Sequence, residues 1–316
     1  MAGFEDMPGV SVVVPVYNGA AFLEELSSRV GSTLRARGVD FEIILVNDGS
    51  RDESWSRINA LASADDRVRG IDFMRNYGQH NALLAGIRKA RGAVIVTMDD
   101  DLQHPPEEIP KLLDGLSPDC DVVYGAPLHE QHDLWRRLTS RLTKKILQIA
   151  MGIPNAGRLS AFRAFRTELR GAFSEATGPF VSIDVMLTWG TNRISFVTVD
   201  HHQRAGGASN YSVGSLLAHA SNLLTGFSVL PLRLASLIGF ALTLFGIAVL
   251  VYVVTRYFML GGSVPGFPFL ASIIAIFSGA QLFALGIIGE YLARMHFRLM
   301  GRPAYQVRQV TANADR

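Results

Sequence analysis

The sequence is poor in cysteine and in net charge. Its single cysteine, Cys120, lies in an apolar stretch and excludes a disulfide within the chain, which fits a domain in a reducing compartment. The formal net charge of +2 is too small to favour nucleic acid as a partner. We find no low-complexity tract and no internal repeat. The first ten residues contain no apolar core of signal-peptide length, so no cleaved targeting segment is expected.

Charge is also missing from two long runs in the last third of the chain. No charged residue stands between Arg233 and Arg256, and residues 257–289 are uncharged but interrupted by GGSVPGFP. A helix that crosses a membrane needs about 20 apolar residues. The hydrophobic share of 48% and the mean hydropathy of +0.22 are high for a purely soluble protein. The sequence therefore predicts two transmembrane helices, at about 232–256 and 268–290.

The distribution of arginine predicts the orientation of these helices. The segment after Glu290 is basic, whereas the loop between the two predicted helices has no basic residue. The arginines of that segment are Arg294, Arg298, Arg302, Arg308 and Arg316. Basic flanks stay in the cytoplasm, and two crossings return the chain to the side it left. We therefore expect a multi-pass protein of the inner or plasma membrane whose large N-terminal domain is cytoplasmic.

Two segments before the predicted spans are amphipathic, and each has two readings. Residues 134–151 combine five basic side chains with an apolar face, which fits a solvated surface helix or a helix on anionic lipid headgroups. Residues 213–230 carry no ionisable side chain except His219, which fits an interfacial helix or an ordinary core helix. The predicted organisation is a globular domain at 1–211, a juxtamembrane helix at 212–230, two spans within 231–292 and a cytoplasmic basic tail at 293–316.

Apolar runs alternate with amphipathic ones from residue 10 onward, which is typical of an α/β fold with a mostly parallel sheet. The predicted strands are 10–17, 41–50, 68–76, 93–101 and 120–126, followed by 159–165 and 193–199. The predicted helices are 20–37, 52–64, 79–90, 106–116 and 182–189. Ser50 or Asp52 is the expected N-cap of the second helix.

Polar residues gather where four successive predicted strands end. They are Tyr17 and Asn18, Asn47 and Asp48, Arg75 and Asn76, and Asp99, Asp100 and Asp101. Turn chemistry explains one such group, because Asn, Asp and Gly favour turns, but it explains four groups poorly. The carboxyl ends of parallel strands form one edge of the sheet, where ligands of open α/β folds bind. We expect a ligand site at this edge.

Three consecutive carboxylates, Asp99 to Asp101, form the most acidic part of this edge. One reading is a solvated acidic turn. The other is a site for a hard divalent cation, Mg²⁺ or Mn²⁺, which offsets the repulsion between the carboxylates and binds a phosphate-bearing substrate. On an extended chain Asp99 and Asp101 project to one side and would bind the metal, while Asp100 points elsewhere.

The segments VPVYN, VNDGS, RNYGQHNALLAG and DDDLQHPPE, in this order, resemble the GT-A glycosyltransferases of family 2. With RAGGASNY and the paired C-terminal spans, the chain is most similar to the polyprenyl-phosphate branch, which includes dolichyl-phosphate mannose synthase and bactoprenol glucosyltransferase. The resemblance implies a Rossmann-like GT-A domain to about Tyr211, followed by an interfacial helix and two transmembrane helices. It implies inverting transfer of one sugar from a UDP- or GDP-linked donor to a polyprenyl phosphate, such as undecaprenyl or decaprenyl phosphate, on the cytoplasmic leaflet.

The resemblance also implies roles for individual residues. The nucleotide contacts would be Pro15, Tyr17, Asn18, Asp48, Arg75, Asp99 and Asp100. The catalytic group would be Asp99, Asp101, Gln103 and Arg163, with Asp99 and Asp101 as the metal ligands. The acceptor phosphate would meet Arg163, Arg204, Ser209 and Tyr211. Guanidinium groups suit this task because their planar fork matches phosphate oxygens.

The chain departs from the family pattern at three positions. His104 and Ala161 stand where many members have Asp, and Asn210 stands where many have Lys. The loss at Ala161 removes a carboxylate often proposed as a base. A lipid phosphate is already ionised at neutral pH, so it can attack the sugar without a base if it is well positioned.

Two other functions remain compatible with the sequence. A processive polysaccharide synthase shares the donor site, but it carries a Gln-x-x-Arg-Trp segment and usually more spans, neither of which we find. A non-catalytic membrane module would bind nucleotide-sugar or lipid without turnover, against which the acidic residues argue. A homo-oligomer is expected. The sequence does not specify the number of subunits, the sugar, the nucleotide of the donor or the length of the prenyl chain.

Overall fold

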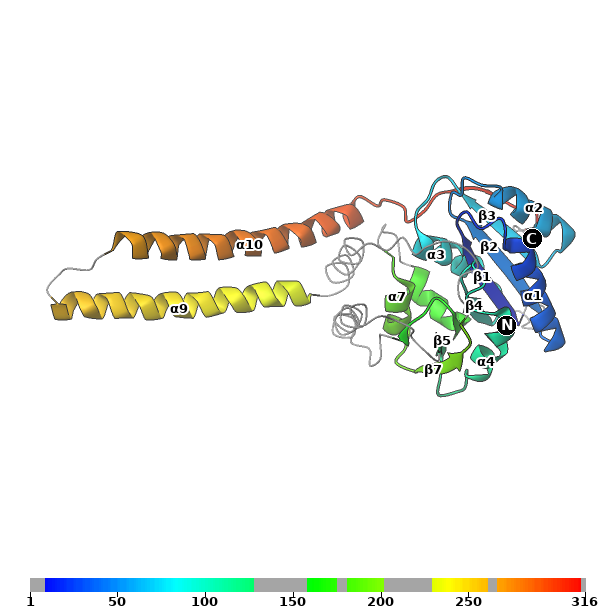
Figure 1. Ribbon diagram of the computed structural model, residues 1–316, viewed down its shortest axis with the longest axis horizontal. Helices are drawn as coiled ribbons and strands as arrows, with labels where there is room; N and C mark the ends of the chain where they lie inside the picture. The colour runs from blue at the N-terminus through cyan, green and yellow to red at the C-terminus, as the bar shows by residue number, and fades with distance from the viewer. Residues whose placement is uncertain (1–8, 128–157, 175–180, 202–228, 261–265, 314–316) are drawn as a thin grey trace. The chain divides into compact units, whose positions relative to one another are not determined.

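The computed structural model describes residues 9–127, 158–174, 181–201, 229–260 and 266–313. The chain forms two compact units (Figure 1). The first contains residues 1–210 and 301–316, and the second contains residues 211–300. The predicted basic helix at 134–151 lies outside the described residues, as does almost all of the predicted juxtamembrane helix.

The first unit is built on an eight-stranded sheet with the order β7-β5-β6-β4-β1-β2-β3-β8. The strands are β1 (Val10–Val16), β2 (Phe41–Asn47), β3 (Val68–Phe73), β4 (Val94–Thr97), β5 (Val122–Pro127), β6 (Arg163–Arg166), β7 (Ile194–Val199) and β8 (Val307–Val310). β1 to β4 run parallel, and β5 pairs in parallel with β7. β6 and β8 are antiparallel to their neighbours. The predicted mostly parallel α/β sheet is confirmed.

Helices cover both faces of this sheet. They are α1 (Leu23–Ala36), α2 (Ser54–Ala64), α3 (Gln79–Lys89), α4 (Ile109–Asp114), α6 (Gly171–Ser174) and α7 (Ile183–Gly190), with the short 3-10 helices η2 (Pro106–Glu108) and η4 (Thr167–Arg170). One core packs α1, α2 and α4 against Val12, Val14 and Val16 of β1. The other packs α3, α6 and α7 on the opposite face, with Val13 of β1. The valines of β1 alternate between the two cores, which explains why the strand is apolar except for Ser11: both of its faces are buried.

The predicted elements exist, and their ends differ by a few residues. The largest differences concern β4, which ends at Thr97 rather than at the acidic run, and β6, which begins at Arg163 rather than at 159. The N-cap residue of α2 is Glu53 rather than Ser50 or Asp52. Asp52 still serves the first turn, because its Oδ1 accepts a hydrogen bond from the Ser54 N–H at 3.0 Å.

The second unit contains two long helices, α9 (Leu230–Leu260) and α10 (Phe267–Leu299), which lie side by side (Figure 1). Among the described residues, two stretches are long and apolar enough to cross a membrane, Pro231–Met259 and Ile276–His296. Most of their large apolar side chains are exposed in the protein, as expected for helices that face lipid. α10 begins close to the predicted position and continues past it to Leu299.

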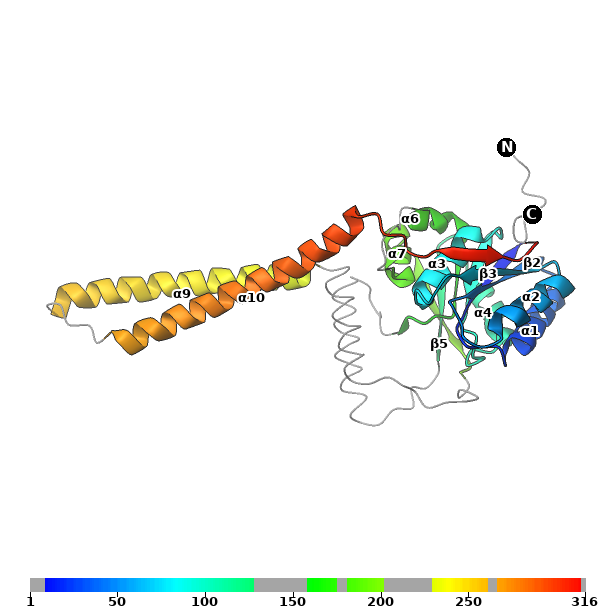
Figure 2. The same cartoon turned by 90° about the horizontal axis from the view of Figure 1, so that it is seen from above.

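The segment after α10 returns to the sheet. Figure 2 shows β8, in red, alongside β3 at the edge of the sheet. Ile71 pairs with Val310 and Phe73 pairs with Val307. The sequence-based division set residues 293–316 apart as a tail, whereas the structure joins residues 301–316 to the N-terminal domain.

Candidate active site

The sheet register brings the four predicted polar groups to one edge. Val16 pairs with Asn47 and Asn47 pairs with Asp72, so β1, β2 and β3 end at the same level. β4 ends three residues earlier, since Thr97 pairs with Val13 whereas β1 continues to Val16. The loops that follow these strands carry Tyr17, Asp48, Arg75 and the acidic run, and they form a single polar edge as predicted.

Asp48 ties the end of β2 to the loop after β3. Its two carboxylate oxygens accept hydrogen bonds from the backbone N–H groups of Tyr77, at 2.6 Å, and Gly78, at 2.8 Å. The side chain is buried, with 3% of its residue surface exposed. Burial raises the pKa of Asp48 above its usual value, and the two hydrogen bonds oppose that shift. Asp48 therefore holds the 74–78 loop in place.

Gly49 allows this loop to approach β2 closely. Its φ is +66°, and a Cβ atom there would lie 2.5 Å from the backbone carbon of Arg75 and 2.5 Å from the backbone nitrogen of Asn76. Backbone atoms cannot move aside as a flexible side chain can, so only glycine fits. The guanidinium of Arg75 lies over the ring of Tyr77, 4.4 Å from its centroid.

Each carboxylate of the acidic run has a different partner. Asp99 Oδ1 accepts a hydrogen bond from the side-chain amide of Gln79 at 2.5 Å. Asp100 Oδ2 accepts one from the Tyr17 N–H at 3.3 Å, and Asp101 Oδ1 accepts one from the Gln103 N–H at 3.2 Å. All three residues are half-buried at the edge of the sheet.

Asp100 faces a different loop from Asp99, although the acidic run is not an extended strand. The run lies in a turn after β4, where Leu102 has a φ of +57°, so the alternation of an extended strand does not apply. Asp100 faces the loop after β1, and a Cβ atom on Gly19 would lie 2.2 Å from its Oδ2. Asp100 therefore links the loop after β1 to the acidic run after β4.

The loop after β1 is fixed by residues that the sequence analysis did not assign to the polar edge. The Asn18 N–H donates to Ser50 Oγ at 2.9 Å, and the Gly19 N–H donates to Ser54 Oγ at 3.1 Å. The Ala20 N–H donates to Asp52 Oδ2 at 3.2 Å. The DGSRDES stretch was the available signal, since Ser and Asp at a helix start bind backbone N–H groups. Tyr17, 49% exposed, is left accessible at this edge, whereas Pro15 is buried within β1.

The structure places Arg163 in the core. Its exposed fraction is 1%, and its guanidinium pairs with the Asp184 carboxylate and donates to Thr97 Oγ1 at 3.0 Å. It also lies over the ring of Tyr124, 5.8 Å from the centroid. Desolvation lowers the pKa of Arg163, but the charge of Asp184 outweighs it and the pKa is raised, so the group stays charged. These partners differ from the acceptor phosphate predicted for Arg163, and Asp184 was missed because nothing local in the sequence links it to β6.

His104 is an uncharged neighbour of the acidic run. It is 9% exposed, stacks on Phe162 with a centroid distance of 5.2 Å and lies 4.9 Å from the ring of His201. Burial, with a smaller effect of His201, lowers the pKa of His104 to about 4, although the charge of Asp101 acts the other way. A neutral ring therefore stands where many members of the family have a third acidic residue.

The part of the sequence that carries the acidic edge matches the model of Glycosyl transferase family 2, over residues 11–173. The chain belongs to glycosyl transferase family 2. This confirms the family predicted from the sequence motifs.

Two relatives resemble this family 2 protein over nearly its whole length. An undecaprenyl-phosphate 4-deoxy-4-formamido-L-arabinose transferase of Shewanella sediminis is 36% identical over 304 residues, which cover 95% of this chain and 92% of the relative. A protein of the same name from Pseudomonas paraeruginosa is 36% identical over 308 residues, covering 96% and 91%. The similarity includes the region of the two long helices.

Solved structures share the fold of the N-terminal domain. Glucosyl-3-phosphoglycerate synthase from Mycobacterium tuberculosis, in complex with Mn²⁺, UDP-glucose and glycerol 3-phosphate, gives a TM-score of 0.50 at 20% identity, covering 69% of this chain and 78% of that one. A mycobacterial protein gives a TM-score of 0.51 at 18% identity, covering 69% and 73%. These likenesses support the GT-A architecture of the family 2 domain.

The acidic edge of this family 2 domain fits a hard divalent cation. Mg²⁺ and Mn²⁺ prefer oxygen ligands, and Mg²⁺ is often held by one or two carboxylates together with the phosphates of a substrate. Asp99 and Asp101 supply such carboxylates. In the described part of the chain no three His, Cys, Asp or Glu side chains converge on one point. Arg204, Ser209, Asn210 and Tyr211 lie outside the described residues.

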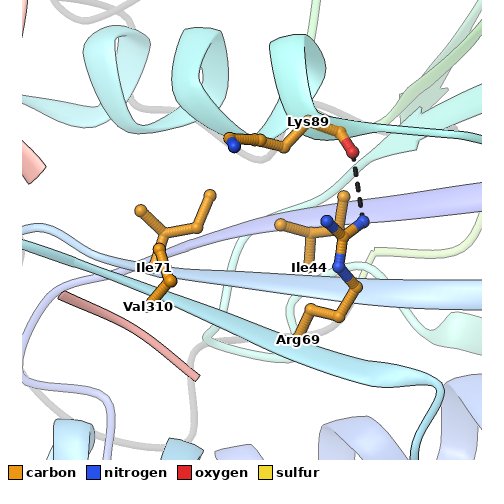
Figure 3. A pocket seen from close by; sticks show the side chains of 5 residues that line it. All are labelled: Ile44, Arg69, Ile71, Lys89 and Val310. Carbon is orange, nitrogen blue, oxygen red and sulfur yellow. Dashed lines mark hydrogen bonds between the residues drawn. The ribbon is translucent and has the colours of Figure 1, made fainter. Parts of the chain in front are cut away.

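A small cavity lies away from this edge, between β2, β3, β8 and α3 (Figure 3). Its walls are Ile44, Arg69, Ile71, Lys89 and Val310. Arg69 is buried near the amino end of β3, where it pairs with Glu42 at 2.6 Å and donates to the Lys89 carbonyl at 3.1 Å. The cavity belongs to the packing of α3 and β8 on the sheet and is separate from the candidate site.

Proposed function

We propose that this family 2 protein transfers one sugar from a nucleotide-sugar to a polyprenyl phosphate. The observation that supports this most directly is the near full-length similarity to two undecaprenyl-phosphate sugar transferases in a chain that keeps the acidic edge. The two long apolar helices give such a protein access to a lipid acceptor.

The donor is proposed to bind at the edge formed by the loops after β1, β2, β3 and β4. Tyr17 and Arg75 are exposed there and can contact the base and ribose. Asp48 contributes by holding the 74–78 loop, since both of its oxygens already accept backbone hydrogen bonds. Asp99 and Asp101 would hold Mg²⁺ or Mn²⁺, which neutralises the charge that develops on the leaving nucleoside diphosphate.

The acceptor phosphate is proposed to act as the nucleophile without a protein base. One of its oxygens forms a bond to C1 of the sugar while the bond from C1 to the diphosphate oxygen breaks, which inverts the configuration at C1. The attacking oxygen is already ionised, so no proton has to leave it. This fits a site in which Ala161 has no carboxylate and His104 is neutral and stacked on Phe162. Positioning and charge neutralisation then carry the reaction.

The sheet domain is proposed to lie on the cytoplasmic side. β3 precedes the two long helices and β8 follows them, and both strands belong to one sheet. If both helices cross the bilayer, the chain must therefore return to the side from which it started. The arginines after Glu290 favour the cytoplasm for that side, where nucleotide-sugars are available.

The test is to incubate membranes that contain the protein with radiolabelled nucleotide-sugars and undecaprenyl phosphate, and to extract the lipids. We expect one labelled sugar to appear in a lipid of one-sugar size. The panel should include UDP- and GDP-linked hexoses and a donor of 4-deoxy-4-formamido-L-arabinose, the sugar for which both relatives are named. A polymeric product would favour a processive synthase. Nucleotide binding with no labelled lipid for any donor would favour a non-catalytic module.

A further inference from the structure

Gln306 and Arg308, which follow the second long helix in the chain, bind the first residue of the loop that Asp48 holds, and Tyr305 stacks on the residue before it. We propose that Tyr305 and Arg308 are positioning residues of the donor site: they fix the 74–78 loop from the side opposite to Asp48. The proposal rests on the proposed function in one respect only, namely that this edge binds the donor. It concerns a part of the chain that lies beyond the family model, which matches residues 11–173.

The first contact binds the backbone where the loop begins. Met74 is the residue directly after β3, and 50% of its residue surface is exposed. Its N–H donates to the Gln306 carbonyl at 3.0 Å, and its carbonyl accepts a hydrogen bond from Arg308 Nη2 at 3.0 Å. Both backbone groups of Met74 are therefore bound by the returning segment, which sets the direction in which the loop leaves the sheet.

The second contact is aromatic. The ring of Tyr305 stacks on Phe73 with a centroid distance of 5.0 Å and an interplanar angle of 10°. Phe73 is fully buried and meets the ring of Tyr77 edge-on, with a centroid distance of 5.7 Å. Aromatic pairs of both geometries are favourable beyond the area that they bury. Phe73 thus joins Tyr305 to the residue whose N–H binds Asp48.

These contacts lead directly to the acidic site. Tyr77 and Gly78 donate to Asp48, and the next residue, Gln79, donates to Asp99. Gly78 has a φ of +93°, so the chain turns sharply between the two interactions. A shift of the 74–78 loop would therefore move two things at once. The backbone N–H groups that bind Asp48 would be displaced, and so would the Gln79 amide that orients Asp99.

The other end of the returning segment provides a matched control. Thr311 exchanges hydrogen bonds with Gly70, since Gly70 N–H donates to Thr311 Oγ1 at 2.9 Å and Thr311 N–H donates to the Gly70 carbonyl at 3.0 Å. Asn313 Nδ2 donates to the Val68 carbonyl at 2.7 Å. Val68 and Gly70 lie at the amino end of β3, away from the polar edge. Loss of Asn313 therefore weakens the attachment of the segment without touching the loop.

The test compares three variants of the full-length protein in detergent or nanodiscs. Tyr305→Ala removes the stack, Tyr305→Phe keeps it and loses only a 3.4 Å hydrogen bond from Arg88, and Asn313→Ala loosens the far end. We expect Tyr305→Ala to raise the donor KM about fivefold, the size expected for the loss of one aromatic pair. The KM for polyprenyl phosphate should stay unchanged. Tyr305→Phe should restore the donor KM, and Asn313→Ala should leave it at the wild-type value.

Hydrogen exchange tests the same proposal without any ligand. Peptides that contain residues 74–78 should exchange about tenfold faster in Tyr305→Ala than in wild type, because the amides of Tyr77 and Gly78 are protected by Asp48 only while the loop is held. Asn313→Ala should not change them. Unchanged protection in Tyr305→Ala, or equal loss in Asn313→Ala at an equal fall in Tm, would overturn the proposal. This readout does not depend on turnover, so a failure of the proposed function is seen separately, as absence of labelled lipid with the wild-type protein.

Discussion

The side-chain amide of Gln79 donates a hydrogen bond to the carboxylate of Asp99 at 2.5 Å. Gln79 is the first residue of α3, and Asp99 is the first carboxylate of the acidic run after β4. The contact connects the start of α3 with the acidic run after β4 at the polar edge. It also occupies one oxygen of Asp99 and thereby orients the carboxylate that we propose as a metal ligand.

Replacing Gln79 with Ala should weaken the metal site. Loss of a residue that hydrogen-bonds a metal-binding side chain typically lowers metal affinity or activity by about 10- to 100-fold. We expect Mn²⁺ affinity, measured by electron paramagnetic resonance in the presence of UDP or GDP, to fall by about tenfold. Gln309→Ala is the matched control, because Gln309 also donates its amide to a carboxylate, that of Asp72, at 3.1 Å. Equal Mn²⁺ affinity in the Gln79 variant and wild type would contradict this role.

Replacing Asp99 or Asp101 with Asn should remove most of the activity. The amide keeps the size of the side chain but loses the charge that binds a hard cation. We expect kcat to fall at least about a hundredfold in each variant, and EDTA to abolish wild-type activity, as measured by lipid-extractable label. Full activity in either variant, or in EDTA, would refute the metal assignment.

Replacing Gly49 with Ala should destabilise the sheet domain. A left-handed residue with a side chain costs roughly 1–2 kcal/mol, and here the added Cβ would also meet the backbone of Arg75 and Asn76 at 2.5 Å. Gly38→Ala has nearly the same φ, +69°, but its Cβ would meet nothing within 4 Å. We therefore expect Gly49→Ala to lower the Tm clearly more than Gly38→Ala in thermal unfolding. An equal fall in Tm would mean that the contact of the added Cβ with the backbone of Arg75 and Asn76 does not destabilise the fold.

Replacing Arg163 with Ala distinguishes a core role from a phosphate contact. Asp184 would lose its buried partner, and breaking such a pair typically costs about 3–5 kcal/mol. We expect a large fall in Tm for Arg163→Ala and a partial recovery in the double variant Arg163→Met with Asp184→Leu, which buries no charge. If the Tm is unchanged and only the KM for polyprenyl phosphate rises, the predicted phosphate contact is the better description.

His104 should make the stability of the protein depend on pH between about 4 and 6.5. Burial lowers its pKa to about 4 in the folded protein, whereas the unfolded chain has the ordinary value of 6.5. Within this window the unfolded state binds more protons, so stability falls as the pH falls. The free energy of unfolding should drop by about 1 kcal/mol between pH 7.5 and pH 5.5 from this group alone. His104→Phe should reduce that drop, measured by denaturant unfolding at both pH values, and an unchanged drop would assign it to other groups.

Much of the sheet domain could be predicted from local patterns. β1 is buried on both faces, so all of its residues except Ser11 are apolar and the strand is visible without an alignment. The parallel order of β1 to β4 then puts their carboxyl ends on one edge, which is why Tyr17, Asp48, Arg75 and the acidic run could be grouped in advance. The two long apolar helices were predictable for a similar reason, because an apolar run of this length without charge is visible in the local sequence.

Other features depended on contacts between residues far apart in the chain. β4 ends at Thr97 because the acidic residues turn toward Gln79, Tyr17 and Gln103 instead of continuing the strand. The family resemblance predicts Arg163 as a contact of the acceptor phosphate, yet Asp184 and Thr97 bind it inside the core. Neither partner can be recognised from the local sequence around the residue that it binds.

The sequence by itself determined the family, the α/β order of the elements, the two apolar helices and the polar edge, because each depends on the chemistry of short segments. Only the tertiary structure decided how the edge is held together. Gln79 and Asp99 are 20 residues apart, and Phe73 and Tyr305 are 232 apart, yet each pair is in contact. Such pairs form only when the whole sheet closes, since hydrogen bonds and ring contacts act over a few ångströms and leave no periodic trace in the chain.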